Sequence, residues 1–396
     1  MNETSSPPRP LPRWWEKALF GVRTAELPRL LPGIGLALAI AFAARSLAGW
    51  LGGALLRLQG LDPEGKGSPV SAISVAVILG LLIANTIGVS RTFSPGLDFS
   101  VKKVLRLGII LVGIKLSVLD VLKVGSVGVP IVIALVAFAL VASLWVARRA
   151  DVSHRLGSLA AASTAICGIT ATLAVAPTVE ADDKEVAYTV ANVTLFGLLG
   201  MLVYPYVAHA LFGDSSGSIG LFLGTAIHDT SQVMGAAISY KEVFGDERAL
   251  QIATVTKLTR NAMLVAVVPA LAILHARRAG RARDEKRSLA KLFPVFILGF
   301  LALSLVRTLG DLGLEGGGLA LGFLSHDGWR RVASLLGDDI AVLALGMALA
   351  SVGLTTRLSV FRGLGPRPFV VGLTAALLVS SASAVLSAWL GPMVGA

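Results

Sequence analysis

The sequence predicts an all-α membrane protein that crosses the bilayer about eleven times. Apolar residues make up 55% of the 396 positions, and charged residues only 15%. A soluble domain carries roughly 25% charged residues, and the mean hydropathy here is +0.77. Apolar runs of the length that crosses a bilayer also recur along the whole chain.

Each predicted span follows from one of these apolar runs. The runs cover 30–50, 70–90, 107–122, 126–147, 157–177, 185–211, 218–240, 249–276, 292–306, 332–355 and 368–394. Lys and Arg are enriched in alternate loops, most of all in 275–287, as cytoplasmic loops usually are. We therefore expect the N-terminus inside and the C-terminus outside. Residues 1–29 lack the apolar core and cleavage site of a signal peptide, so we expect a retained basic cytoplasmic tail.

Two pairs of segments indicate an internal repeat. "LGLLIANTIGV" (79–89) aligns with "LGTAIHDTSQV" (223–233), and "KVLRLGIILVG" (103–113) aligns with "KLTRNAMLVAV" (257–267). Both pairs lie five spans apart, and an odd separation reverses the direction through the membrane. Inverted repeats of this kind are typical of secondary transporters, although chance similarity between apolar helices is the alternative.

The repeat fixes the predicted organisation of the chain. After the tail, 30–69 forms an extra span and loop, 70–211 the first inverted five-helix repeat, and 218–394 the second. The alignment also predicts that the third span begins nearer Leu97, which places Lys103 and Arg106 within the membrane. By symmetry we expect these two cations to meet Lys257 and Arg260 near the bilayer midplane.

Lys257 and Arg260 are the most informative charged residues. They lie inside the eighth predicted span, three positions apart and so on one helical face. A charge within a span is costly unless it faces a polar pathway or a partner, and a guanidinium matches the shape of an oxyanion. The pattern therefore favours an anion site. The alternative is a structural pair that binds backbone carbonyls or a distant acid such as Asp229.

Two further cations lie within predicted spans. Lys115 can line the same pathway, pair with Asp120, or extend to the membrane surface. Arg45, near the end of the first span, is expected to reach the surface.

Small residues indicate where helices break. Gly168 and Pro177 interrupt a Ser- and Thr-rich apolar run in 163–187, and the equivalent span of the second repeat, 337–356, contains Gly346 and Gly353. Transporters use broken helices to aim helix N-termini at anionic substrates, so we expect crossed, broken helices at these two spans. Ordinary packing of small residues is the alternative.

Five consecutive polar residues, 228–232, interrupt the seventh apolar run. Lipid would leave these groups unsatisfied, so they are expected to face a polar cavity. His228 and Asp229 are neighbours and cannot face one point from a regular helix. Either the backbone is unwound there, or only one of the two lines the site. A tight loop between two shorter spans is the alternative.

Several functional classes are excluded or weakened by the sequence. Cys167 is the single cysteine, which excludes an intramolecular disulfide and a cysteine zinc site. No His, Asp and Glu group has metal-ligand spacing, and no glycine-rich loop carries the Lys needed for nucleotide phosphates. We therefore expect no cofactor, no metal and no nucleic-acid partner. The acidic run from Glu180 to Glu185 is expected to form a solvated loop on the outer side.

The chain resembles the YeiH-type family of bacterial inner-membrane proteins, which are described as sulfate exporters. The motifs that carry the resemblance are "LRLGIILVGIKLS", "AICGITATLAVAPTVEADDKEVA", "VTLFGLLGMLVYP", "GTAIHDTSQVMGAA", "KLTR" and "LALGMALASVGLTT". The resemblance implies a bacterial cytoplasmic-membrane protein with a fold similar to that of cation/proton antiporters and bile-acid transporters. The family motif positions are Arg106, Lys115, Cys167, Gly168, His228, Gln232, Lys257 and Arg260. Asp229 stands where some relatives have Glu.

These observations lead to one functional prediction and two alternatives. We expect a secondary transporter that exports a small anion such as sulfate, sulfite or an organosulfonate, and not an enzyme. The expected substrate-binding residues are Arg106, Lys115, Gly168, His228, Asp229, Gln232, Lys257 and Arg260. A cation/proton antiporter that uses Asp229 is the first alternative, and a membrane enzyme that uses His228 and Asp229 is the second. The expected partners are the anion and the bilayer, and a homodimer stays open.

Overall fold

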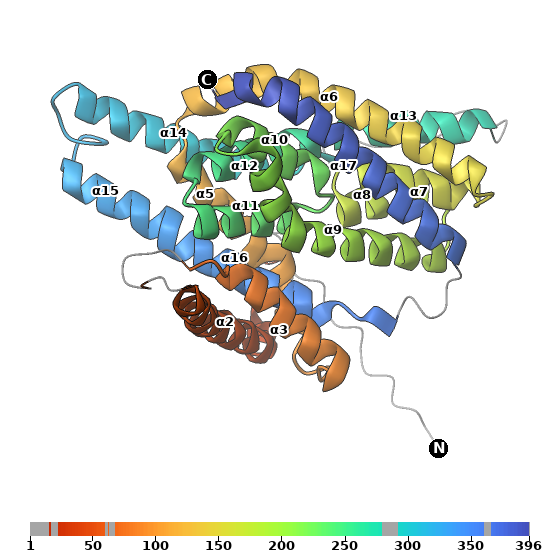
Figure 1. Cartoon of the computed structure of the whole chain (residues 1–396), viewed down its shortest axis with the longest axis horizontal. Coiled ribbons are helices and arrows are strands. Elements are labelled where there is room, and N and C mark those ends of the chain that lie inside the picture. Colours follow the sequence, from red (N-terminus) through yellow and green to blue (C-terminus); the bar gives the residue numbers. More distant parts are fainter. Residues whose placement is uncertain are drawn as a thin grey trace.

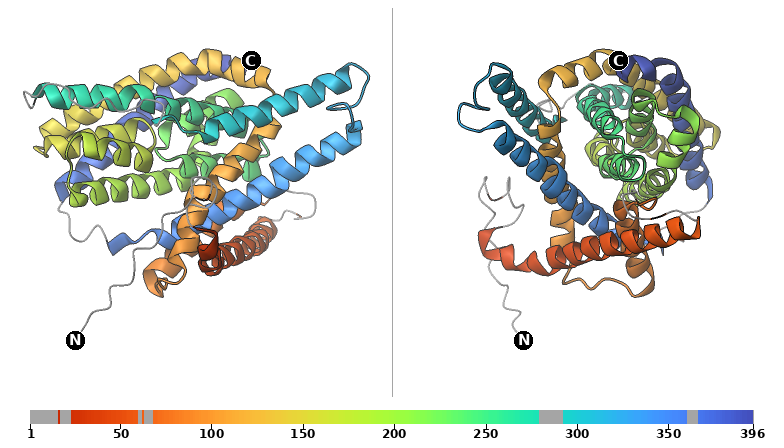
Figure 2. Two further views of the ribbon diagram at one scale, coloured as in Figure 1. Left: turned by 180° about the vertical axis from the view of Figure 1, so that it is seen from behind. Right: turned by 60° about the vertical axis from the view of Figure 1, so that its left-hand side comes forward.

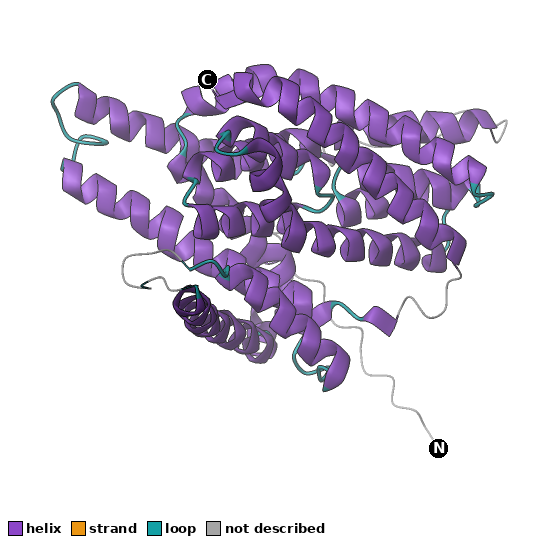
Figure 3. Ribbon diagram, viewed as in Figure 1, coloured by secondary structure: helices purple, strands orange, loops and turns teal. Residues whose placement is uncertain are grey.

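The structure is helical throughout the part that it describes (Figures 1 and 3), which confirms the predicted all-α class. It is a computed structural model, and it describes residues 16, 23–59, 62, 68–278, 292–359 and 366–395. Most of the predicted tail, 1–29, lies outside these residues, and so does 279–291 of the basic loop.

Seven helices of the described part are long and apolar enough to cross a membrane. They are α2 (Leu31–Leu58), α6 (Val118–Arg149), α9 (Asp183–Phe212), α12 with α13 (Glu247–Ala262 and Leu264–Arg278), α14 (Phe296–Glu315), α15 to α16 (His326–Ser334, the π-helix η6 Leu335–Ile340, and Ala341–Thr355) and α17 (Pro366–Gly395). The outer faces of these helices expose large apolar side chains such as Trp389, Val141 and Phe42. Such a surface suits a lipid environment, because the exposure of large apolar side chains to water is unfavourable.

The other helices are shorter or interrupted. They are η1 (Thr24–Arg29), α3 (Ala72–Thr86), α4 (Ser94–Phe99), the π-helix η2 (Ser100–Val104), α5 (Leu105–Val112), η3 (Gly113–Lys115), α7 (His154–Ala165), α8 (Gly168–Val175), η4 (Ala176–Thr178), α10 (Ser216–Ala226) and α11 (Thr230–Phe244). The predicted number of eleven spans is not confirmed by these lengths.

The third predicted span lies earlier in the chain than its apolar run, 107–122, suggested. It begins with α4 at Ser94, as the repeat alignment predicted, and ends with η3 at Lys115. Ser117 then begins α6, because its hydroxyl accepts from the Asp120 amide while the Asp120 carboxylate accepts from the Ser117 amide. This reciprocal cap starts a new helix. The predicted boundary between 107–122 and 126–147 was therefore wrong.

The segment predicted as the fifth span, 157–177, turns back halfway. Next to the start of α7, the Ser153 hydroxyl lies 2.5 Å from the Glu185 carboxylate at the start of α9. Gly168, at the start of α8, packs against Val193, further along α9. Thus α7 runs parallel to α9, and α8 returns antiparallel to it, reaching the start of α9 again after η4. Together α7 and α8 form a helical hairpin, hairpin 1.

The segment predicted as the seventh span, 218–240, turns back in the same way. Gly220 and Gly224 of α10 pack against Ile252 and Thr256 of α12, so these two helices run parallel. By contrast, α11 runs antiparallel to α12, since Thr230 meets Asn261 at one end of the pair and Lys241 meets Glu247 at the other. Together α10 and α11 form hairpin 2.

The two hairpins enter the molecule from opposite ends. At the α7 end, α6 and α13 end while α9 and α17 begin. At the α10 end, α9 and α11 end while α12 begins (Figure 2). The expectation that 157–177 and 218–240 each cross the membrane was therefore wrong. The acidic run 180–185 also lies at the α7 end, where α13 ends, whereas the sequence predicted this run and the loop after α13 on opposite sides of the membrane.

The predicted break in 337–356 is absent, because η6 and α16 continue as one helix through Gly346 and Gly353. A Cβ at Gly353 would lie 2.4 Å from the Val77 carbonyl oxygen, and one at Gly80 would lie 2.6 Å from that of Ala350. These glycines therefore allow α3 and α16 to touch, which was the packing alternative. The two segments that contain broken helices are therefore 157–177 and 218–240. The repeat boundaries, 70–211 and 218–394, stay a prediction.

Candidate functional site where two hairpin tips meet

The tips of hairpins 1 and 2 meet in the interior. Helix α7 ends at Ala165 and α8 begins at Gly168, while α10 ends at Ala226 and α11 begins at Thr230. The Gly168 amide donates to the His228 carbonyl oxygen at 3.3 Å, which joins one tip to the other. A Cβ at Gly168 would lie 2.0 Å from Val193 Cγ1, so only glycine allows hairpin 1 to pack this closely on α9.

A capping box begins the second arm of hairpin 2. The Asp229 Oδ1 atom accepts from the Ser231 amide at 2.9 Å and from its hydroxyl at 2.5 Å. Gln232 Oε1 accepts from the Asp229 amide at 3.3 Å, and Gln232 Nε2 donates to the Thr194 carbonyl oxygen. This cap explains how the backbone can be unwound at Asp229. An unwound backbone was one of the two interpretations that the sequence allowed for this run.

Lys257 ties the two tips together. Its ammonium group is fully buried and donates to the carbonyl oxygens of Ile166 at 3.0 Å, Ile227 at 3.1 Å and His228 at 2.5 Å. The first acceptor belongs to the tip of hairpin 1 and the other two to the tip of hairpin 2. All three donor positions of the ammonium group are thus occupied by backbone oxygens.

Arg260 does the same one helical turn further along α12. Its Nε donates to the Ala165 carbonyl oxygen at 2.6 Å, and its Nη1 donates to those of Thr225 at 2.6 Å and Ile227 at 3.2 Å. Its Nη2 donates to the carbonyl oxygen of Thr164. These oxygens belong to the last turns of α7 and α10 and the residues after them, where helix carbonyls have no partner within the helix. The positive charges also oppose the negative ends of both helix dipoles.

The structure therefore supports the carbonyl-binding alternative for Lys257 and Arg260. Neither residue is part of the lining of the central cavity described below. The predicted convergence of four cations is not what the structure shows, because Arg106 is exposed whereas Lys257 and Arg260 are enclosed by helix ends.

A large cavity extends from the hairpin tips toward the α7 end. Its empty volume is about 1630 Å³, including its open mouth. Its polar lining comes from several elements: Lys102 and Arg106 before and in α5, Cys167 and Thr170 of hairpin 1, Thr194 of α9, Asp229, Thr230, Ser231 and Gln232 of hairpin 2, and Asn261 of α12. Pro294 to Phe296, before and at the start of α14, also line it. We call this space the central cavity.

Arg106 is, with Lys102, one of the two cations in the described lining of the central cavity. Its guanidinium lies 5.9 Å from the ring centroid of Phe296 and its side chain is exposed. Asp229 and Gln232 line the same cavity at the tip of hairpin 2, so the structure brings together these three predicted site residues. Gly168 contributes its backbone at the adjoining tip.

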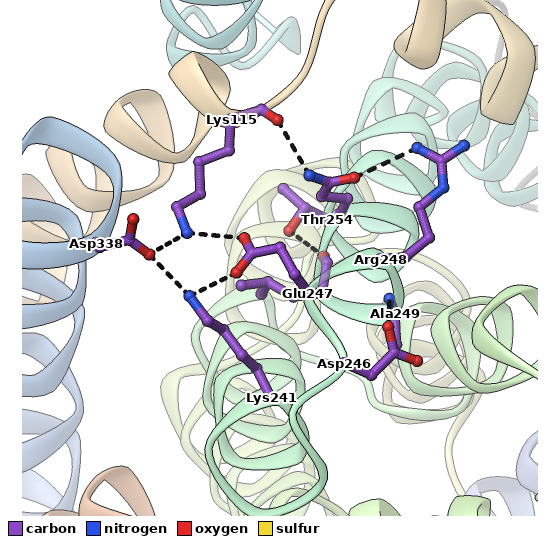
Figure 4. Close-up of polar contacts among 10 residues, drawn as sticks. Lys115, Lys241, Asp246, Glu247, Arg248, Ala249, Thr254 and Asp338 are labelled. Carbon is purple, nitrogen blue, oxygen red and sulfur yellow. Dashed lines mark hydrogen bonds and ion pairs between the residues drawn. The ribbon is translucent and has the colours of Figure 1, made fainter. Parts of the chain in front are cut away.

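His228 and Lys115 lie elsewhere. His228 faces a smaller cavity that is shared with Thr164, Tyr188 and Asn192, so His228 and Asp229 do not line one space. Lys115 lies at the α10 end of α5, where it forms ion pairs with Glu247 and Asp338 rather than the expected one with Asp120 (Figure 4). Asp120 pairs with Arg248 instead.

Sequence reasoning predicted that the run 228–232, which includes Thr230, faces a polar cavity, but it missed Asn261. Thr230 Oγ1 lies 3.2 Å from Cys167 Sγ and accepts from Asn261 Nδ2 at 3.0 Å. The other amide atom, Asn261 Oδ1, is buried and has no hydrogen-bond partner among the described residues. The KLTRN segment was noticed for its cations, and its Asn carried no signal of its own. Within the described residues, no group of three or more His, Cys, Asp or Glu could hold a metal ion.

Comparison with known proteins places the chain in a family. A family model described as "Conserved hypothetical protein 698" matches residues 33–372. A UPF0324 membrane protein of Bacillus cereus is 33% identical over 91% of this chain and 95% of its own length. The chain belongs to the UPF0324 membrane protein family. A family member from Oceanobacillus iheyensis is also 33% identical, over 88% of this chain and 92% of its own. One from Streptococcus agalactiae is 28% identical over 91% and 98%.

Family membership confirms the resemblance seen in the sequence and makes the chain a multi-pass membrane protein. Its relatives are named as membrane proteins, and the names give no substrate. No solved structure matches the chain.

Proposed function

We propose that this UPF0324 protein is a secondary transporter that exports a small oxyanion from a bacterial cell. Sulfate, sulfite and organosulfonates are the substrates that we put forward, driven by a proton gradient or the membrane potential. Two hairpins that enter from opposite ends and meet beside a cavity support this proposal, because transporters bind substrate near the bilayer midplane at discontinuous helices.

The observation that carries the proposal is the uncapped N-terminus of α8 in the central cavity. No side chain caps this helix, and its first residues, Gly168 to Thr170, include two that line the cavity. The Gly168 amide donates to the His228 carbonyl oxygen, so the amides of the next residues, Ile169 and Thr170, are the ones that we propose for the oxyanion, together with the positive end of the helix dipole. Arg106 supplies the permanent positive charge that a divalent oxyanion needs.

Asp229 favours a second candidate, a cation/proton antiporter. Asp229 lines the same cavity, and among the described residues its Oδ2 accepts a hydrogen bond from the Cys167 thiol, at 3.7 Å. Such a protein would be stabilised by sodium and not by sulfate.

The basic residues after α13 support the proposed orientation of the cavity in the membrane. Helix α13 ends at the α7 end, where His275 lies beside His154, and the sequence that follows it, 279–291, contains several Arg and Lys. Because cytoplasmic loops carry this excess, we place the α7 end in the cytoplasm, with the N-terminus inside. The central cavity then opens toward the cytoplasm, as export requires for substrate uptake.

We do not propose an enzyme. A membrane enzyme built on His228 and Asp229 needs both groups at one substrate, and the two side chains line different cavities.

The test is flux in proteoliposomes. Purified protein would be reconstituted, and the uptake of labelled sulfate, sulfite and a small organosulfonate would be followed with and without a pH gradient. Saturable uptake of at least one oxyanion supports the proposal. Absence of flux for the whole panel, with sodium-dependent stabilisation, would favour the antiporter.

A further inference from the structure

Four charged residues form a closed ionic ring at the α10 end (Figure 4). The Lys115 ammonium lies 2.8 Å from Glu247 Oε1 and also pairs with Asp338. The Lys241 ammonium lies 2.5 Å from Glu247 Oε2 and 2.9 Å from Asp338 Oδ1. Positive and negative groups alternate around this ionic quartet, so each charge has two neighbours of opposite sign.

Every member of the ionic quartet comes from a different structural element that also reaches the central cavity. Lys115 ends the helical segment that carries Arg106, and Lys241 lies near the end of α11, which Asp229 caps. Glu247 begins α12, which carries Asn261 near its end. Asp338 belongs to η6, and α16, which continues it, reaches the cavity at Val352. Nine to fourteen residues separate the members of each pair in sequence, or about 14–21 Å of helix.

Between the cavity and the ionic quartet, glycines of one helix pack against apolar side chains of another. A Cβ at Gly235 of α11 would lie 3.2 Å from Leu349 Cδ1 of α16, and one at Gly108 of α5 would lie 2.7 Å from Leu345 Cγ. Smooth helix surfaces of this kind pack tightly, but they interlock little. The directional contacts that join these helices at the α10 end include the four ion pairs of the quartet and the hydrogen bond from Gln251 Nε2 of α12 to the Lys115 carbonyl oxygen, at 3.0 Å.

A local irregularity of the backbone positions Asp338. The residue lies in a π-helical turn, which is a frequent feature of functional sites. A Cβ at Gly337, next to it, would lie 2.8 Å from Lys115 Cγ, so glycine lets the lysine chain pass along this turn. The side chains of the quartet are between 11% and 42% exposed, so they lie at the rim of the packed core rather than deep inside it.

We propose that the ionic quartet is the gate that closes the central cavity at the α10 end. This inference rests on the proposed transport function, because a gate has meaning only for a cavity that opens to each side in turn. In this proposal, the structure corresponds to the state in which the cavity is accessible from the α7 end and the quartet closes the other end. In the opposite state α11 and α12 part from α5 and α16, and all four ion pairs break.

The single cysteine makes the gate directly testable without any transport assay. A Cys167→Ser, Thr170→Cys variant carries one reporter thiol on an exposed, cavity-lining position. A membrane-impermeant thiol reagent would be applied to either face of sealed vesicles of known orientation. With the quartet intact, we expect labelling from the α7 face and little from the α10 face.

Removing charges from the quartet should open the second path. In the reporter background we would measure Glu247→Gln, Lys241→Met and Asp338→Asn, each of which breaks two ion pairs on a different element. We expect labelling from the α10 face to rise about tenfold, which corresponds to about 1.4 kcal/mol in the equilibrium between the two states. Arg248→Gln is the matched control, since Arg248 adjoins Glu247 but pairs with Asp120 outside the quartet; its labelling should stay at the reporter level.

The outcomes separate the gate from the proposed function. If labelling from the α10 face stays unchanged in every quartet variant that elutes as a monodisperse species, the ionic quartet is not a gate. Labelling of the unaltered reporter from the α10 face alone would also overturn the proposal. If labelling changes as expected while no oxyanion is transported, the gate stands and the proposed substrate class falls.

Discussion

Lys257 and Arg260 show how cations within a membrane protein can satisfy backbone carbonyl groups. Within the described residues, their seven hydrogen bonds all go to carbonyl oxygens of hairpins 1 and 2. Without these donors, helix ends that meet inside the protein would be unsatisfied, which is costly in the absence of water. The pair therefore holds the two tips in place and thereby shapes the adjoining cavity.

Lys257→Met is expected to destabilise the folded protein. The variant removes three charge-assisted hydrogen bonds to buried carbonyl oxygens and leaves that of Ile166 without its donor, whereas Arg260 still donates to Ile227 and the Gly168 amide to His228, so we expect a cost of about 3 kcal/mol. Arg260→Lys should also be poorly tolerated, because a single ammonium nitrogen cannot reproduce the four hydrogen bonds that the three guanidinium nitrogens make. Thermal unfolding in detergent checks both, with Arg45→Lys as a control that should be nearly silent. An unchanged unfolding midpoint for Lys257→Met would contradict the assigned role.

Arg106 has the opposite expected behaviour. Because its side chain is exposed and touches mainly Phe296, Arg106→Gln should change the unfolding free energy by no more than about 0.5 kcal/mol. It should instead abolish saturable oxyanion flux, and Arg106→Lys should impair it, since an ammonium group lacks the bidentate fork. Flux and thermal unfolding measured on the same preparations separate these effects. A variant that unfolds at a lower temperature and transports normally would show that Arg106 is structural.

At the scale of single elements, hairpin 1 depends on a glycine. A Cβ at position 168 overlaps Val193, so Gly168→Ala should push α8 away from α9 and lower both stability and flux. The double variant Gly168→Ala with Val193→Ala removes the overlapping side chain and should recover much of the loss. Recovery identifies close packing as the reason for glycine. If the double variant is as impaired as the single one, the glycine is needed for another reason.

Local signals predicted the starts and interruptions of helices better than their course. The polar run at 228–232 predicted an unwound backbone, and Asp229 and Gln232 have the spacing of the capping box that forms there. No local pattern could show that the chain turns back, because that follows from contacts such as Ser153 with Glu185 and Lys241 with Glu247. The break expected in 337–356 failed because glycine serves helix packing equally well there.

At the scale of the whole molecule, the all-α class followed directly from composition and apolar length. The partner of the buried cations did not follow from the sequence. A buried Lys or Arg indicates that a partner is present, but it does not show whether that partner is a ligand or a backbone carbonyl. The central cavity is assembled from segments between residues 101 and 352, so no sequence window contained it. The ionic quartet likewise joins residues 115 and 338, which no spacing rule connects.

A bound oxyanion should stabilise the whole protein. Ligand that binds only the folded state adds about 2.7 kcal/mol at a concentration one hundred times its dissociation constant. We expect the unfolding midpoint to rise with sulfate or sulfite at constant ionic strength, and the rise to be absent in Arg106→Gln. Chloride at matched ionic strength is the control. A rise with sodium, independent of the anion, would favour the antiporter.

The central claim is that an oxyanion binds at the hairpin tips beside Arg106 and crosses the membrane there. Counterflow of labelled sulfite or sulfate in proteoliposomes tests it most directly, with Arg106→Gln and Arg45→Lys compared at equal protein content. The account predicts saturable exchange for the unaltered protein and for Arg45→Lys, and exchange near the protein-free background for Arg106→Gln. Equal exchange in all three proteins, or none in any of them for every oxyanion tested, would contradict it.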